Sequence, residues 1–233
     1  YIVITGDIKF QIVRDDGYKI IGQPYQVYCI ENNYKIDLQS TNKSVYGYIS
    51  ISENFILKKF WGSFSVNTKA KIGSNNGEKI TNKQKIIIEH KNRNITETSL
   101  KYTNSKIEYI RAIKSTNFDF FSDKSKKTFF HKEFKVTKLS DRMGMRLEGQ
   151  VLKNIVDSNI KSEGLVKGVI QVPSDGNPII MLSDHGTIGG YPKIANVISA
   201  DFDKLVQMIP GSIIKFKEVN LDEAEKLFQF YNL

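Results

Sequence analysis

Short stretches in which apolar and polar residues alternate run through the first 60 residues of this chain. Segments 9–13, 25–30 and 44–51 are examples, and turn-forming residues separate them, as at Asp15-Asp16-Gly17. A period of two places successive side chains on opposite faces of a β-strand, and Gly, Asp and Asn between such runs favour hairpins. The first part of the chain is therefore expected to be all β.

The later part of the chain keeps this pattern but adds residues that set backbone geometry. Beyond Ser140 lie 4 of the 5 prolines and 9 of the 16 glycines. Strands are expected at 85–89, 105–113, 165–172, 178–183, 193–199 and 212–219, and short helices at 122–130, 201–208 and 221–231. Together these segments predict a mainly β, barrel-like architecture with a few short helices.

The formal net charge of +9 is unevenly distributed. Residues 1–139 hold 24 Lys and Arg against 13 Asp and Glu, whereas residues 140–233 hold 10 against 12. The excess is spread through strand-like segments, and 29 of the cations are Lys and only 5 are Arg, the residue that reads guanine and clamps phosphate with two hydrogen bonds. No nucleic-acid partner is therefore expected.

Membrane and redox signals are weak in this sequence. No segment approaches the roughly 20 apolar residues that span a bilayer, and the first residues lack a basic n-region and a cleavage site. We therefore expect no membrane partner and a cytoplasmic location. The single cysteine, Cys29, stands in the apolar run 27–30 and is expected to fill the core.

Segment 140–149 alternates almost perfectly and carries the first candidate site. As a strand it would bury Met143, Met145 and Leu147 on one face. The opposite face would then present Arg142, Gly144, Arg146 and Glu148. Two guanidinium groups beside a glycine suit a carboxylate, carbamate or phosphate ligand. The alternative is that Arg146 and Glu148 simply pair on the surface.

A second candidate region follows the strand expected at 178–183. Asp184 ends this strand, and the loop from there to Pro192 contains the pair Gly189-Gly190, which lets backbone N–H groups approach a ligand. An ordinary tight connection is built in the same way. His185 is expected to be a solvated loop residue, because none of the three histidines has metal-ligand spacing.

Several blocks of the later part, taken together, resemble one known family. They are residues 140–149, 162–164, 168–173, 176–179, 184 and 189–194. In order, spacing and residue type these blocks resemble the family of the 5-oxoprolinase C subunit, also called allophanate hydrolase subunit 2, which is similar to the carboxyltransferase domain of urea carboxylase. The resemblance implies cyclophilin-like β-barrel subdomains, here expected at residues 1–113 and 114–233, with the family motifs in the second.

The resemblance also implies a reaction and partners. The family works with a related B subunit, of the allophanate hydrolase subunit 1 type. Together with an amidohydrolase-type A subunit, the assembled enzyme uses ATP to open 5-oxoproline to glutamate. ATP is accordingly expected to act together with the partner subunit. The biotin acceptor sequence Ala-Met-Lys-Met is not present, so biotin is expected only in trans.

Residue roles follow from the matched blocks. In this interpretation Arg142 and Arg146 clamp an anion, and Glu148 and Asp184 orient hydrogen bonds. The residues expected to contact the substrate are Gln171, Gly189, Gly190 and Tyr191. We expect the site to be a cleft between the strand at 142–148 and the loop at 184–192.

Two alternatives remain open because the first part departs from the family pattern. Glu53-Asn54 stands where Gly-Gly is usual, and Phe64 replaces an Arg. One alternative is a regulatory binding protein, since a relative of this family antagonises a histidine-kinase inhibitor in sporulating bacteria. The other is a degenerate remnant that folds without activity.

Overall fold

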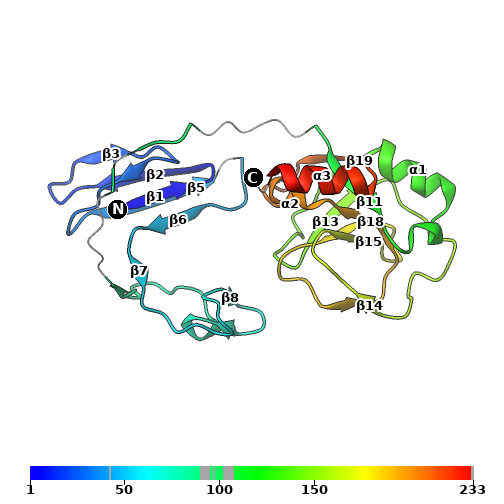
Figure 1. Cartoon of the computed structure of the whole chain (residues 1–233), viewed down its shortest axis with the longest axis horizontal. Coiled ribbons are helices and arrows are strands. Elements are labelled where there is room, and N and C mark those ends of the chain that lie inside the picture. The colour runs from blue at the N-terminus through cyan, green and yellow to red at the C-terminus, as the bar shows by residue number, and fades with distance from the viewer. Residues whose placement is uncertain (42, 90–94, 97, 102–107, 232–233) are drawn as a thin grey trace. The chain divides into compact units, whose positions relative to one another are not determined.

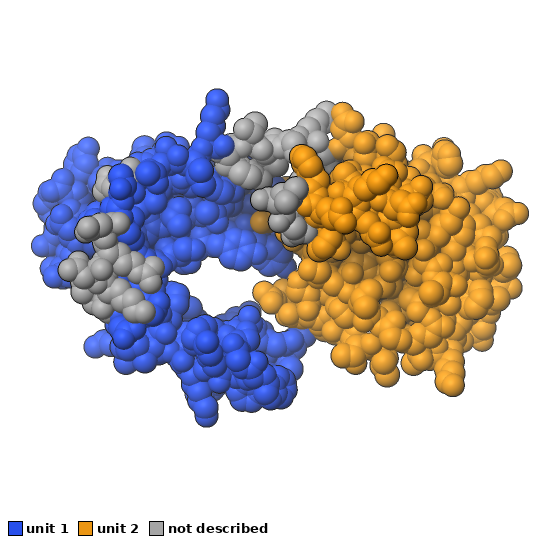
Figure 2. Space-filling model, in the orientation of Figure 1, with its two compact units in different colours: residues 1–103 blue, residues 104–233 orange. Residues whose placement is uncertain are grey.

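The chain consists of two compact units (Figure 2). The structure is a computed structural model, and it describes residues 1–41, 43–89, 95–96, 98–101 and 108–231. Unit 1 spans Tyr1–Thr103 and unit 2 spans Asn104–Leu233. The boundary expected at residue 113 falls inside strand β11 (Ile110–Lys114), which is hydrogen-bonded into the barrel of unit 2.

Unit 1 is built from small antiparallel sheets. β1 (Ile2–Thr5) lies between β4 (Val27–Tyr28) and β6 (Tyr48–Ile51), and β2 (Ile8–Val13) lies between β3 (Lys19–Ile21) and β5 (Lys35–Thr41). The buried core consists of Ile2, Ile4, Phe10 and Ile12. These residues alternate along β1 and β2, as the period of two predicts.

In the described residues, the remainder of unit 1 contains only short ladders. β7 (Asn54–Phe55) pairs with β10 (Ile88–Glu89), and β8 (Val66–Asn67) pairs with β9 (Ile72–Gly73), which precedes the 3-10 turn η1 (Asn75–Gly77). The strands described in this unit form separate sheets, whereas the sequence predicts a second barrel. The strand expected at 85–89 is reduced to its last two residues.

Unit 2 contains a closed seven-stranded barrel in the order β11-β18-β15-β16-β13-β12-β19 (Figure 1). The strands after β11 are β12 (Glu133–Val136), β13 (Gly144–Gly149), β15 (Val169–Gln171), β16 (Ile179–Met181), β18 (Lys193–Val197) and β19 (Ile213–Glu218). Six of the seven contacts between neighbours are antiparallel, and the parallel pair β11–β19 closes the ring. The mainly β architecture is thus confirmed.

Apolar side chains fill this barrel, and helix α1 (Asp123–His131) packs onto it. Met145, Leu147, Ile170 and Ile180 all lie in one buried cluster. Ser122 caps α1 by accepting a hydrogen bond from the Ser125 backbone N–H, so the helix begins where the sequence predicts. Phe129 of α1 stacks on Phe216 of β19, with ring centroids 4.4 Å apart.

The described part of unit 2 also contains two further helices and a 3-10 turn. η2 spans Phe118–Phe120, α2 spans Ser199–Val206, which is two residues earlier than expected, and α3 spans Leu221–Tyr231, as expected. Asp201 in α2 is 2% exposed and is bound to Arg111 of β11. Within the described ranges, no helix has the length and apolar character needed to cross a membrane.

Two residues predicted to be buried are exposed. Met143 is 38% exposed, because β13 starts only at Gly144 and Asp141 Oδ1 accepts the N–H groups of Met143 and Gly144 in a turn. Met145 and Leu147 are each 2% exposed, as predicted. Cys29 is also exposed, because β4 ends at Tyr28 and the chain leaves the sheet there.

Candidate functional site

One row of residues crosses four neighbouring strands on the outer face of the unit 2 barrel. The strand registers pair Arg146 of β13 with Ile179 of β16, Ile179 with Gln171 of β15, and Gln171 with Lys193 of β18. The alternate residues Met145, Leu147, Ile170 and Ile180 point into the barrel core. The row therefore projects outward, with neighbouring strands roughly 4.8 Å apart.

A short two-stranded ladder covers part of this face. β14 (Glu163–Gly164) pairs with β17 (Ile188–Gly189), and we call residues 160–166 and 186–191 the strap. Leu165 of the strap packs with Val169 and Met181, outward-facing residues of β15 and β16. In Figure 1, β14 lies on the opposite side of the barrel from α3. Gln171 is consequently only 4% exposed.

Gly189 allows the strap to approach Gln171 closely. A Cβ atom at position 189 would lie 2.8 Å from Gln171 Nε2 and 2.8 Å from Leu165 Cδ1. Gln171 Nε2 donates a hydrogen bond of 3.0 Å to the carbonyl oxygen of Tyr191. A Cβ atom at position 190 would lie 3.1 Å from the carbonyl oxygen of Ile160. The structure thus brings Gln171, Gly189, Gly190 and Tyr191 close together.

Three further polar residues join this group, and sequence reasoning missed them as site residues. Lys193 is 7% exposed, and its ammonium group contacts the carboxylate of Glu163 in the strap. Asn117, which is 4% exposed, accepts a hydrogen bond of 3.2 Å from the Lys193 backbone N–H. Its Nδ2 lies 3.5 Å from Glu163 Oε1.

The electrostatics of this cluster favour the ion pair. The Lys193 hydrogen bond and charge, with a smaller contribution from Asn117, lower the pKa of Glu163, although partial burial of the carboxylate opposes this effect. Lys193 and Glu163 both lie in blocks that carry the family resemblance. The one sequence feature that could have identified Lys193 as a site residue is its place on an otherwise apolar strand. That feature alone does not show whether the charge is buried or exposed.

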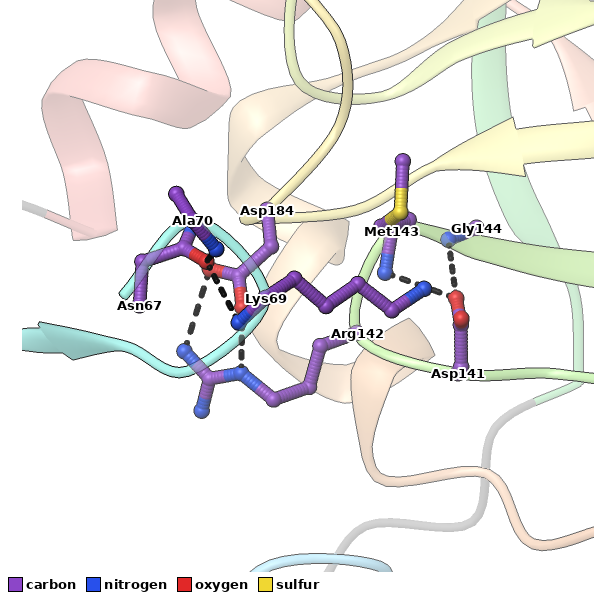
Figure 3. A network of polar contacts seen from close by, with 8 residues as sticks. All are labelled: Asn67, Lys69, Ala70, Asp141, Arg142, Met143, Gly144 and Asp184. Atoms are coloured by element: carbon purple, nitrogen blue, oxygen red, sulfur yellow. Dashed lines mark hydrogen bonds and ion pairs between the residues drawn. The ribbon is translucent and has the colours of Figure 1, made fainter. Parts of the chain in front are cut away.

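Arg142 and Asp184 form a separate pair beyond the ends of β13 and β16 (Figure 3). Arg142 Nε and a terminal guanidinium nitrogen donate to the two Asp184 oxygens at 2.7 and 3.1 Å. The Asp184 backbone N–H also donates to the Arg142 carbonyl oxygen at 2.9 Å. Asp184 therefore fixes the orientation of the Arg142 guanidinium.

Arg146 and Glu148 do not pair with each other, so the alternative of a simple surface pair is wrong. Glu148 makes a 3.1 Å ion pair with Lys135 of the neighbouring strand β12. Among the described residues, none forms an ion pair with the exposed Arg146 guanidinium. Arg146 thus offers an available cation at one end of the row, while Glu148 lies beside β12.

Two shallow depressions on unit 2 involve none of the predicted site residues. One, of about 400 Å³, lies along α1 and is lined by residues including Lys124, Lys127 and His131. The other, of about 360 Å³, lies beside β19 and includes Tyr109 and Phe216. The chemistry of the strap region is better defined, because it combines buried hydrogen-bonding groups with close backbone approach.

Comparison with known proteins gives consistent matches over most of the chain. Residues 1–218 match the family described as carboxyltransferase domain, subdomain A and B. The chain is 31% identical to the C subunit of 5-oxoprolinase from Haemophilus influenzae, over 97% of this chain and 76% of that protein. It is 32% identical to the corresponding C subunit from Escherichia coli, over 84% of this chain and 63% of that protein.

Solved structures agree on the fold. The urea amidolyase of K. lactis superposes with a TM-score of 0.85 at 19% identity, over 99% of this chain and 15% of that protein. The urea carboxylase of Kluyveromyces lactis superposes with a TM-score of 0.82 at 20% identity, over 99% of this chain and 22% of that protein. Because the family match spans nearly the whole chain and the fold agrees with it, the chain belongs to the carboxyltransferase-domain family, subdomains A and B, which includes the C subunits of 5-oxoprolinase.

Proposed function

We propose that the chain is a non-autonomous subunit of an ATP-dependent 5-oxoprolinase, which opens the lactam ring of 5-oxoproline to give glutamate. The observation that carries this proposal is the similarity to the C subunit of H. influenzae 5-oxoprolinase along 97% of the chain. The polar row from Arg146 to Lys193 supports it, because the row supplies groups suited to a carboxylate and an amide.

The proposed reaction needs activation, since an amide carbonyl is a poor target for water. Transfer of the ATP γ-phosphoryl group to the lactam oxygen gives ADP and an activated carbon. Attack by one water molecule and cleavage of the C–N bond then give γ-glutamyl phosphate, and a second water molecule hydrolyses this acyl phosphate to glutamate and phosphate. Phosphoryl transfer depends on positioning and on cations near the developing charge. In this scheme Arg146 holds the substrate carboxylate, and Arg142, oriented by Asp184, supplies a second cation.

Partners complete the proposed enzyme. ATP would be used together with a related subunit of the B type, and an amidohydrolase-type A subunit would complete the assembly in the cytoplasm. Biotin, if used at all, would arrive on another chain. This division of labour predicts that the chain alone shows no ATP-dependent hydrolysis of 5-oxoproline.

The test is reconstitution with the two partner subunits of the same organism. Glutamate formation and ADP release should require all three chains and 5-oxoproline. Arg146→Ala should weaken the substrate interaction by roughly 1.5–3 kcal/mol, since it removes a charge-assisted contact without touching the buried face of β13. Lys215→Ala is the matched control, because Lys215 is an exposed cation on another barrel strand, paired with Glu133.

The outcomes separate the alternatives. Hydrolysis by the isolated chain would refute the proposal that it works only in a complex. Equal kinetics and equal melting temperatures for wild type and Arg146→Ala would place the anion contact elsewhere. A wild-type complex that assembles but turns over no ATP would favour the regulatory or the degenerate alternative.

A further inference from the structure

The strap region contains hydrogen-bonding capacity that the described residues do not use. Gln171 Nε2 donates to Tyr191, but no described residue donates to Gln171 Oε1, although the residue is 4% exposed. The Lys193 ammonium has three donors, and Glu163 is its one described partner. The buried Oδ1 of Asn196, also on β18, has no described partner either.

Of these groups, Asn196 Oδ1 is a fully buried atom without a described partner, whereas Gln171 and Lys193 are largely buried residues with spare capacity; such groups are normally satisfied by a partner, a ligand or water. Gln171 and Lys193 are partners on the adjacent strands β15 and β18, at a register shift between Ile170 and Gln171, so an acceptor and a donor stand on neighbouring strands. The backbone at Gly189 lies directly against the Gln171 carboxamide, since a Cβ atom there would be 2.8 Å from Nε2 and 3.0 Å from Oε1, so a ligand reaches this group only when the strap moves away. The complementary ligand therefore presents one donor and one acceptor along the same edge.

We propose that Gln171 and Lys193 bind a lactam, the cyclic amide of the substrate. The lactam N–H donates to Gln171 Oε1, and the lactam carbonyl oxygen accepts from Lys193 Nζ. In a small ring the amide is held cis, so its N–H and C=O lie on one edge, whereas the trans amide of an open chain presents them on opposite sides. This inference rests on the proposed function and adds the atoms that recognise the substrate.

Other residues of the row could contact the remaining parts of the lactam substrate, its ring methylene groups and its carboxylate. Ile179 separates Gln171 from Arg146, is partly buried, and offers an apolar surface for the ring methylene groups. Arg146 lies two strands from Gln171, roughly 10 Å between Cα atoms, within reach of its long side chain toward a ring carboxylate. The Lys193 ammonium then lies at the carbonyl oxygen, where it polarises the carbonyl group that the reaction activates.

Ligand entry requires the strap to lift from Gln171. The ladder that builds the strap has two residue pairs, Glu163 with Gly189 and Gly164 with Ile188. Its attachments to the barrel include the Leu165 contacts and the Glu163–Lys193 ion pair. A small ligand at Lys193 can exchange contacts with Glu163 without disturbing the barrel strands beneath.

The experiment compares 5-oxoproline with its lactone analogue, in which the ring N–H is replaced by oxygen. Binding of each to the assembled complex is measured without ATP by calorimetry. Wild type should bind the lactam about tenfold more tightly, because the lactone leaves Gln171 Oε1 without a donor. Gln171→Met, similar in volume, should reduce this ratio to about one, whereas Gln171→Glu keeps an acceptor and should preserve the preference for the lactam.

Glu133→Ala is the control, because its carboxylate is exposed, pairs with Lys215 and has no part in the proposed site. It should leave the ratio unchanged. Suppose that the wild-type complex hydrolyses 5-oxoproline, but Gln171→Met and wild type show the same preference for the lactam over the lactone. That result would overturn the lactam assignment and leave the proposed function intact. Absence of any preference in wild type would overturn it as well. A wild-type complex that neither binds nor hydrolyses 5-oxoproline would remove both.

Discussion

Lys193 is buried, although lysine side chains usually lie on the surface. Lysine is almost never fully buried unless it is paired, and here Glu163 provides the pair while Asn117 binds both the Lys193 backbone and the carboxylate. Removing one partner of such a pair leaves a charge with poor solvation. The ion pair therefore fixes the strap against the barrel and also specifies where the strap lies.

Glu163→Gln tests this contact through its pH dependence. Because the pKa of Glu163 is lowered in the folded state, the carboxylate contributes stability above its ordinary pKa of 4.5, and this contribution is lost as pH falls through the lowered pKa. The variant should be less stable than wild type at pH 7, and the difference should shrink at more acidic pH. Urea unfolding at pH 7, 5, 4 and 3 measures it.

Glu148→Gln serves as the comparison for that series. It removes a carboxylate of the same type from an exposed pair, for which the expected loss is between 0 and about 1 kcal/mol. If Glu163→Gln and Glu148→Gln lose the same stability at every pH, the Lys193 contact has no special role in holding the strap.

The residues of segment 140–149 show how far sequence reasoning extends at this scale. The alternation correctly predicts that Met145 and Leu147 are buried. It fails at Met143, because the period of two says nothing about where the strand begins, and Asp141 turns the chain there. Lys193 was missed for a related reason: burial of a charge depends on Glu163, which is 30 residues away in the sequence.

At the scale of elements, α2 is attached to the barrel by a buried ion pair. Asp201 Oδ2 accepts a hydrogen bond of 2.8 Å from the Arg111 backbone N–H and one of 2.9 Å from Arg111 Nε of the guanidinium group. Asp201 is 2% exposed, and the Arg111 side chain is 16% exposed. One carboxylate thus satisfies both the main chain and the side chain of β11.

Asp201→Ala should therefore destabilise the protein by about 3–5 kcal/mol, since it leaves a largely buried guanidinium without its carboxylate. Asp203→Ala is the matched control, because Asp203 lies on the exposed face of the same helix. The free energy of unfolding of Asp203→Ala is expected to stay within about 0.5 kcal/mol of the wild-type value. Urea denaturation followed by circular dichroism gives both values, and similar losses for the two variants would contradict the assigned role of Asp201.

Elements with a local signal were predicted well, and those defined by distant partners were not. The N-cap at Ser122 and the apolar period of α3 are encoded within a few residues. The strap is different, because β14 and β17 are two residues each and exist only by pairing with one another. The parallel contact between β11 and β19, which closes the barrel, likewise joins segments about 100 residues apart.

At the scale of the whole molecule, the two units differ in how much core they contain. Among the residues that the structure describes, the main cluster of unit 2 comprises 20 buried residues, all from that unit, whereas the cluster of unit 1 comprises four. Unit 1 also exposes many large apolar side chains, among them Ile56, Trp61 and Ile87. Burial of apolar surface is the main source of stability, so the units should differ strongly in stability when separated.

A fragment of residues 104–233 is accordingly expected to fold alone, because it retains all seven strands of the closed barrel. A fragment of residues 114–233 should not, because it lacks most of β11 and so exposes the edges of β18 and β19 and loses Ile110 and Ala112 from the core. Circular dichroism and thermal unfolding of the two fragments measure the difference. The longer fragment should unfold cooperatively, whereas the shorter one should aggregate or show no transition. Cooperative unfolding of both at one temperature would mean that β11 is dispensable and that the barrel closes without it.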